Sequence, residues 1–463
     1  MRRRIGRSIK KRMRQGLVVL EPNVAGVDCG SREHWVCAAA KESGQLSVKG
    51  FATMTEQLEA LADWLHQQGV VSVAMESTGT YWISLFDLLE ERGFEVLLVD
   101  ARKLKKVPGR KTDILDCQWI QQLHSCGLLE GCFRSPAVIR ELRALARERS
   151  NLKADSGTVV QRMQKALDQM NVQLHHAVTD LTGVTGMKIL RAIVGGERDP
   201  QHLARYRDRR CGKSQAQIAQ HLKGTWRDEH LFTLESNLER YDHLQTMLEK
   251  YEQQIILRLQ QLSPPERQDR PVPTHPNARK DKDMRRRGEA PLRTALWRFS
   301  GIDLTRIDGL GSEAALRVIS EVGFDLTSFP TSKDFVSWLK TCPPLNRSAG
   351  KNRKGRAKGF GSSRIAQVLR MGALSLKNSP TALGGSYRRM ARRKGSSIAI
   401  GATARKLAEH IYRALRWGIQ YLDQGAEAYE ARFQNNRLKY ATKIAKSMGY
   451  TLVPLENPNE VSA

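Results

Sequence analysis

The sequence predicts an α/β domain followed by a mostly helical remainder. Short apolar runs separated by turn residues fill the first fifty residues, and from residue 55 onward similar runs alternate with helical patterns. Beyond about residue 139 apolar residues recur at three- and four-residue steps, the period of a helix. We therefore expect an N-terminal layer with a mixed sheet and then an all-α region.

The expected elements of the first domain come in the order βββαβαβα. Tight turns join the first three strands, which indicates an antiparallel meander, and the later strands are linked by crossover helices that favour parallel pairing. Catalytic groups in open α/β sheets gather at the carboxyl ends of strands. The strands are predicted at 24–30, 34–40, 46–52, 70–75 and 94–100, and the helices between them at 55–68 and 82–91.

The rest of the chain shows two long helical patterns and one break. Leu234, Leu238, Tyr241 and Leu248 belong to an imperfect heptad that either mediates self-association, which we favour, or packs as an antiparallel pair within one protomer. The predicted organisation is a basic arm (1–23), an α/β domain (24–130), a helical or coiled-coil region (131–262), a charged Pro-rich linker or insertion (263–297), a helical C-terminal domain (298–425) and a tail (426–463).

Composition favours a polyanionic partner. Lys and Arg number 76 against 48 Asp and Glu, a formal net charge of +28, and the first 16 residues alone carry eight basic residues. No apolar run approaches the roughly 20 residues that span a bilayer, so we expect a cytoplasmic protein. The seven cysteines are scattered without paired spacing, which argues against a zinc site or disulfides, and Cys29 is expected to be a small buried hydrophobe.

Four acidic residues form the first candidate site. Asp28 and Glu76 end apolar runs and precede turn-forming residues, so core packing explains them poorly. Asp113 and Asp116 are three apart, which on a helix places both carboxylates on one face. A ribonuclease-H-like fold would gather all four, and carboxylate oxygens are the ligands that Mg²⁺ prefers.

Further segments are candidates for contact with phosphate. Residues 304–323 resemble a helix-hairpin-helix whose Gly309–Gly311 turn offers N–H groups to phosphate, with a plain helical hairpin as the alternative. In the Gly-rich loop 342–367, composition alone favours a phosphate-binding or turn role for Ser348 over that of a nucleophile. The residues predicted to contact nucleic acid are Arg102, Lys103, Lys105, Lys106, Arg110, Lys111, Arg347, Lys351, Arg353, Lys354 and Arg356.

Taken together, these motifs resemble the insertion-sequence one-ten family of DEDD transposases. The resemblance rests on Asp28, on Glu76 in AMESTGTYW, on KTDILD, and on the distant NRSAGKNRKGR with a terminal GYTLVP. Residues 24–130 resemble the family's RuvC-like domain, and about 298–425 its transposase domain. One glycine of the family's usual SGGK-like run is Ala349 here, and the charged 263–292 stretch looks like an insertion.

Family membership would imply an RNA-guided recombinase that moves its own element. The four acids would bind magnesium, and Ser348 would attack DNA to form a covalent phosphoserine. A structured noncoding bridge RNA would pair with donor and target DNA. The protein would act as a homotetramer in the cytoplasm of a prokaryote, associated with the nucleoid when bound to DNA.

Two other functions fit the residues. A RuvC-like junction nuclease would hydrolyse DNA with two metals and water, leaving free 5′-phosphate ends and no attached protein. A non-catalytic nucleic-acid chaperone would use the +28 charge and would keep its function when the four acids are neutralised.

Overall fold

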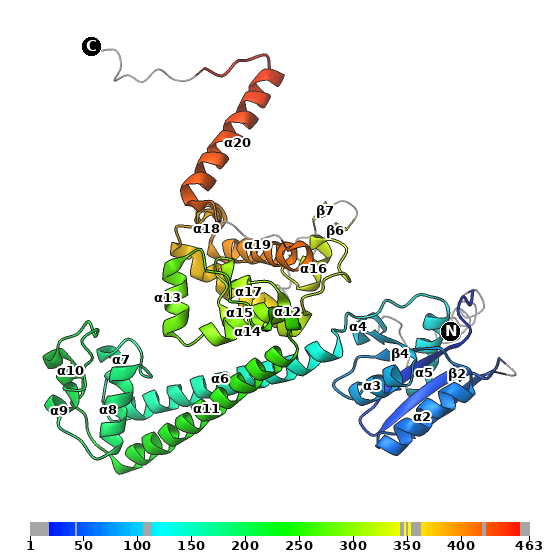
Figure 1. Ribbon diagram of the computed structural model, residues 1–463, viewed down its shortest axis with the longest axis horizontal. Helices are drawn as coiled ribbons and strands as arrows, with labels where there is room; N and C mark the ends of the chain where they lie inside the picture. Colours follow the sequence, from blue (N-terminus) through cyan, green and yellow to red (C-terminus); the bar gives the residue numbers. More distant parts are fainter. Residues whose placement is uncertain are drawn as a thin grey trace, which may run out of the picture. The chain divides into compact units, whose positions relative to one another are not determined.

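The computed structural model describes residues 18–41, 44–104, 113–342, 347–348, 351–352, 363–418 and 423–453. At 102–103, 113, 347–348 and 351–352 it describes the backbone alone, and most of the predicted basic arm lies outside the described residues. The chain divides into two compact units, Met1–Arg134 and Ser135–Ala463. The first carries the large sheet and the second the long helices (Figure 1).

A five-stranded mixed sheet forms the first unit. Its strands lie in the order β3-β2-β1-β4-β5. Strands β1, β2 and β3 pair antiparallel, whereas β1, β4 and β5 pair parallel, so the predicted meander and mixed sheet are confirmed. The bounds are β1 Val24–Cys29, β2 Glu33–Ala39, β3 Leu46–Ala52, β4 Ser72–Glu76 and β5 Glu95–Val99.

Helices cover both faces of this sheet. Because side chains alternate along a strand, Val27 and Met75 point to one face, where they share a buried core with Leu61 and Leu85 of two helices. On the opposite face Ala74 packs with Ile120 of a third helix. These helices are α2 Thr55–Gln67, α3 Ile83–Glu91 and α5 Asp113–Ser125, and a short α4, Ala101–Leu104, follows β5.

An antiparallel helical hairpin opens the second unit. Arg258 donates to Glu141 at 2.8 Å and Gln245 donates to Ser156 at 3.0 Å. The later residue of one helix thus contacts the earlier residue of the other, which shows that the two helices run antiparallel. The structure therefore shows the second of the two predicted alternatives, in which the heptad seam packs within one protomer. The helices are α6 Ala137–Gln169 and α11 Asp228–Gln261.

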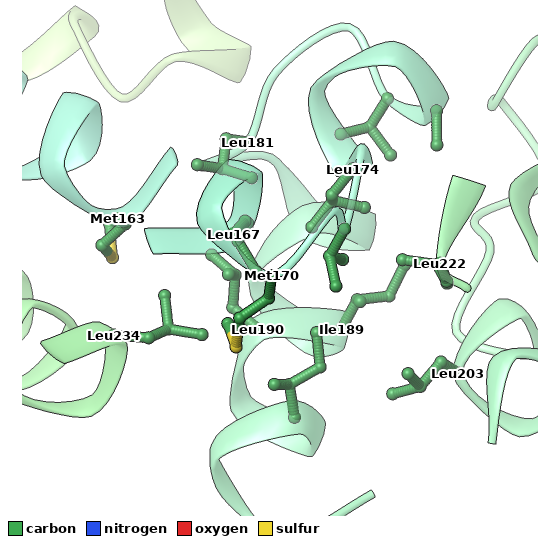
Figure 2. Close-up of a cluster of buried hydrophobic side chains, with 14 of the residues drawn as sticks. Met163, Leu167, Met170, Leu174, Leu181, Ile189, Leu190, Leu203, Leu222 and Leu234 are labelled. Atoms are coloured by element: carbon green, nitrogen blue, oxygen red, sulfur yellow. The ribbon is translucent and has the colours of Figure 1, made fainter. Parts of the chain in front are cut away.

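The far end of the hairpin carries a small helical subdomain, the tip. Figure 2 shows its core, in which Met163, Leu167 and Met170 from the end of α6 meet Leu190 and other apolar side chains. All of the labelled side chains are buried. The tip comprises α7 Leu174–Ala177, α8 Val184–Val194, α9 Pro200–Ala204 and α10 Gln215–His221.

Residues 263–297, predicted to be a linker or insertion, form helices that pack against the residues after them. The guanidinium of Arg293, with 6% of its side chain exposed, lies 2.6 Å from the nearly buried carboxylate of Asp303. His275 is buried and hydrogen-bonds the carbonyl oxygen of Thr305 at 3.1 Å. These polar contacts add to the few large apolar side chains that the segment buries, Met284, Leu292 and Leu296. The helices are α12 Pro265–Gln268, α13 Ala278–Arg286 and α14 Ala290–Ser300.

The C-terminal part is helical, as predicted, and the helices continue into the predicted tail. The long helix α19 begins at Ser396, and the predicted tail contains a 23-residue helix, α20. Among the described residues, no helix combines the length and apolarity that a bilayer span needs. The elements are η1 Leu304–Arg306, α15 Ser312–Val322, α16 Ser332–Trp338, β6 Arg347–Ser348, β7 Lys351–Asn352, α17 Arg364–Ser375, η2 Leu376–Asn378, α18 Ala382–Lys394, α19 Ser396–Trp417 and α20 Gly425–Ser447.

A glycine allows α5 to approach the sheet. A Cβ atom added at Gly26 would lie 2.1 Å from the backbone nitrogen of Gln121 and 2.5 Å from the carbonyl oxygen of Cys117. We expect Gly26→Ala to lower the free energy of unfolding by about 3 kcal/mol, since neither backbone atom can move alone. The matched variant Gly157→Ala, in α6 with no atom within 4 Å of its added Cβ, should raise stability by about 1 kcal/mol. Thermal unfolding of both variants checks this, and an unchanged Gly26→Ala would contradict it.

Lys280 gives the 263–297 segment a pH-dependent stability. Its ammonium donates to the carbonyl oxygens of Thr305 and Ile307, and burial lowers its pKa from 10.5 to about 8. Between these pH values the unfolded state binds more protons, so the contribution of Lys280 to stability rises with pH across that window, by roughly 3 kcal/mol. Urea unfolding from pH 7.5 to 10.5 should show this rise in the natural protein and not in Lys280→Met. Identical pH profiles would contradict the assignment.

Candidate active site

Asp28 and Glu76 lie side by side at the carboxyl ends of two parallel strands. Val27 of β1 pairs with Met75 of β4, and each acid is the next residue along its strand. Because Val27 and Met75 face the α2–α3 core, the alternation of side chains turns both acids to the opposite face. That is the face on which α5 packs. The register of two strands thus brings together two of the predicted acids.

Helix α5 carries the other two acids over this end of the sheet. The close approach at Gly26 fixes the helix against β1 at Cys117 and Gln121. Asp113 and Asp116 precede this contact, in the first turn of α5. Asp116 is half-buried, whereas the side chain of Asp113 lies outside the described residues.

The negative charge of Asp28 helps to raise the pKa of the Cys117 thiol. Burial raises the pKa of this thiol to about 12, with further contributions from Cys37 and from the negative charge of Asp28. A charge on β1 that affects a thiol on α5 lies near the start of that helix. Asp28, Glu76 and the first turns of α5 therefore lie on the same face of the sheet.

The loop after β4 holds Glu76 in place. Thr78 Oγ1 donates to Glu76 Oε1, and the backbone N–H of Ser77 donates to the carbonyl oxygen of Val99 at 2.9 Å. Trp82 Nε1 donates to the carbonyl oxygen of Gly79 at 3.1 Å, which closes the loop onto the start of α3. One oxygen of Glu76 is therefore oriented by a hydroxyl group.

The donor set at this edge suits a hard cation. Carboxylate oxygens are the ligands that magnesium selects, and the neighbouring thiols stay protonated at neutral pH and do not compete. Burial raises the pKa of Cys29 well above its usual range, and the charges of Asp28 and Glu76 raise it further. Among the described side chains, no three His, Cys, Asp or Glu residues form a group that could hold a metal.

The predicted basic segments are only partly described. Arg102 and Lys103 lie in α4, with the backbone alone described, and Ser348 pairs with Lys351 in the β6–β7 hairpin, next to the pair Arg347–Asn352. Residues of the prediction outside the described ranges are Lys105, Lys106, Arg110, Lys111, Arg353, Lys354 and Arg356.

The Gly309–Gly311 turn is used for packing. Gly309 has a φ of +82°, and a Cβ there would lie 2.7 Å from the carbonyl oxygen of Gly372 in α17. A carboxylate oxygen of Glu289 lies 3.6 Å from the position of a Cβ on Gly311. A single 3-10 turn, η1, stands where a first hairpin helix is predicted. These contacts favour close helix packing over a phosphate site.

Sequence reasoning missed Gly26 and Thr78. Gly26 interrupts a run of strand-forming residues, and a glycine within a strand marks a close backbone approach, so that signal was present. Thr78 lies two residues after a strand end and carries no signal of its own.

The thiols beside the acids should be chemically inert. We expect Cys29 and Cys117 to resist iodoacetamide at pH 8 because both are buried and their pKa values are raised. Cys211 and Cys342, which are partly exposed, serve as internal controls and should react. Peptide mass spectrometry of the native protein measures this. Labelling of Cys117 as fast as Cys342 would show that the α5 face is open, and equally fast labelling of Cys29 would show the same of the α2–α3 face.

Comparisons with known families agree with this arrangement. A model for the DEDD domain of IS110 elements, described as a transposase, matches residues 25–172, which include all four predicted acids. A model described as the transposase of the IS116/IS110/IS902 family matches residues 302–384, which include Ser348. No curated protein matches the chain. The two matched segments together, one in each half of the sequence, place the chain in the IS110 family of transposases, which cut and rejoin DNA.

Proposed function

We propose that this transposase is an RNA-guided recombinase that uses four acids and one serine. Asp28, Glu76, Asp113 and Asp116 bind magnesium, and Ser348 is the nucleophile. A structured noncoding RNA pairs with donor and target DNA, and the protein acts as a tetramer. The observation that carries the metal assignment is the adjacent, same-face placement of Asp28 and Glu76 beneath the start of α5.

The proposed reaction conserves phosphodiester bonds. The Ser348 oxygen attacks a DNA phosphorus, its proton is lost, and a deoxyribose oxygen leaves and takes up a proton. The free hydroxyl of the second DNA strand then attacks the phosphoserine and releases the serine. Bound magnesium would neutralise charge that develops on the phosphate oxygens. Asp28 and Glu76 would hold the magnesium, and the hydroxyl of Thr78 fixes one oxygen of Glu76.

The backbone register of the β6–β7 hairpin supports the role of Ser348. Ser348 and Lys351 are direct cross-strand partners, so a short hairpin brings a hydroxyl-bearing residue and a cationic residue to one rung of the ladder. A nearby cation favours the nucleophilic form of a hydroxyl and neutralises charge on the phosphate.

The serine assignment is tested by the covalent adduct. Protein, co-expressed RNA and DNA carrying the element's end are incubated with magnesium, and a denaturant-resistant protein–DNA adduct is mapped by mass spectrometry. We expect an adduct at Ser348 that Ser348→Ala abolishes and that Ser397→Ala, an exposed serine of α19, retains. Cleavage with free ends and no adduct would instead support a junction nuclease.

The acid assignment is tested separately. We expect Asp28→Asn and Glu76→Gln each to reduce cleavage at least about 100-fold, because charge stabilisation at the phosphate is lost. Chelation of magnesium should abolish cleavage in the natural protein. Binding of RNA should persist in both variants, and Glu56→Gln, an exposed acid at the start of α2, should cut normally. Full cleavage by the Asp28 and Glu76 variants would refute the metal assignment.

A further inference from the structure

Helix α20 extends beyond the helices that support it. Its first turns rest on α18, where the guanidinium of Arg389 lies 3.3 Å from the ring centroid of Phe433 and pairs with Glu430. No residue of α20 is buried. Figure 1 shows α20 running outward from its base at α18. We call residues 434–453 the α20 arm.

All charged side chains of the α20 arm are basic. Residues 431–453 contain no Asp or Glu, and neither does the stretch 383–408, which holds α18 and the start of α19. The last turn of α18, Arg392 to Lys394, is basic and exposed. Such a concentration of like charge is unfavourable in the isolated protein and becomes favourable beside a polyanion. The basic residues of 431–453 are Arg432, Arg437, Lys439, Lys443 and Lys446.

Apolar side chains form a stripe next to these charges. Tyr440 is 67% exposed, Ile444 42% and Met448 67%. Each of Lys439 and Lys443 directly precedes one of them, so a basic stripe and an apolar stripe run together along the helix. A merely solvated lysine face would not need exposed tyrosine, isoleucine and methionine. Nucleic acid offers phosphates and apolar base edges side by side, which matches both stripes.

We propose that the α20 arm is a second DNA-contacting element, one that lies in the major groove of duplex DNA. A helix with its side chains is about 10–12 Å across, and the major groove of B-form DNA is about 12 Å wide. The major groove of A-form RNA is too deep and narrow to admit a helix. The lysine stripe contacts phosphates, and Tyr440 and Ile444 face base edges. This contact is independent of the proposed metal and serine chemistry.

The test removes the charges of the arm together. The quadruple variant Arg437→Gln, Lys439→Gln, Lys443→Gln, Lys446→Gln is compared with the natural full-length protein by fluorescence anisotropy on mixed-sequence duplex DNA across a salt series. We expect the quadruple variant to bind duplex DNA about tenfold more weakly at physiological salt. The slope of log affinity against log salt should fall by about 3 to 4, since each lost phosphate contact removes nearly one unit. An unchanged slope would overturn the proposal.

Two controls separate this contact from general electrostatics and from misfolding. Lys439→Arg, Lys443→Arg, Lys446→Arg keeps the charges and should bind as the natural protein does; a loss equal to that of the quadruple variant would overturn the proposal. Removing four exposed charges on the tip should leave the slope unchanged, and an equal loss there would show that the effect is not local. The tip changes are Lys188→Gln, Arg205→Gln, Lys223→Gln and Arg227→Gln.

The apolar stripe distinguishes DNA from other occupants. Tyr440→Ser with Ile444→Ser should weaken binding to duplex DNA and leave the mass measured by light scattering unchanged. If these changes alter the oligomeric state and leave DNA binding intact, the arm contacts a second copy of the chain and the proposal fails. Tighter arm-dependent binding to duplex RNA than to duplex DNA would also overturn it.

Discussion

The arrangement of the acids depends on one backbone contact, the approach of α5 to β1 at Gly26. No side chain separates the strand from the helix there, so the peptide groups of Cys117 and Gln121 lie directly over it. The position of α5 fixes where its first turn begins, and hence where Asp116 lies relative to the strand ends. A bulkier residue at 26 would lift the helix and separate the two halves of the acidic set without changing any acid.

The environment also decides which groups carry negative charge. The chain is strongly cationic overall, yet the edge of the sheet gathers carboxylates beside cysteines. Burial keeps the thiols neutral, so the charge stays on hard oxygen atoms. That division favours a hard divalent cation over a soft metal, and it reduces the risk that oxidation of a thiolate disables the edge.

The sequence predicted the first unit well because its signals are local. Asp28 and Glu76 follow short apolar strands, and the alternation of side chains then sets their common face. The folded state of residues 263–297 was not predictable in the same way. Arg293, Lys280 and His275 hold that segment through polar contacts with residues 303–307, and a pattern of large apolar residues cannot reveal such contacts. The heptad of α11 did not show which helix packs on it, because the same apolar seam suits either a second chain or α6.

The antiparallel course of α6 and α11 has a consequence for how the chain can change in evolution. Its two helices leave and re-enter the same unit next to each other, and the tip has an apolar core of its own. The tip is therefore a separate module at the end of the α6–α11 hairpin. Equal deletions in α6 and α11 can shorten the hairpin, and the tip can be replaced by another module, while the path of the chain through the later helices stays the same.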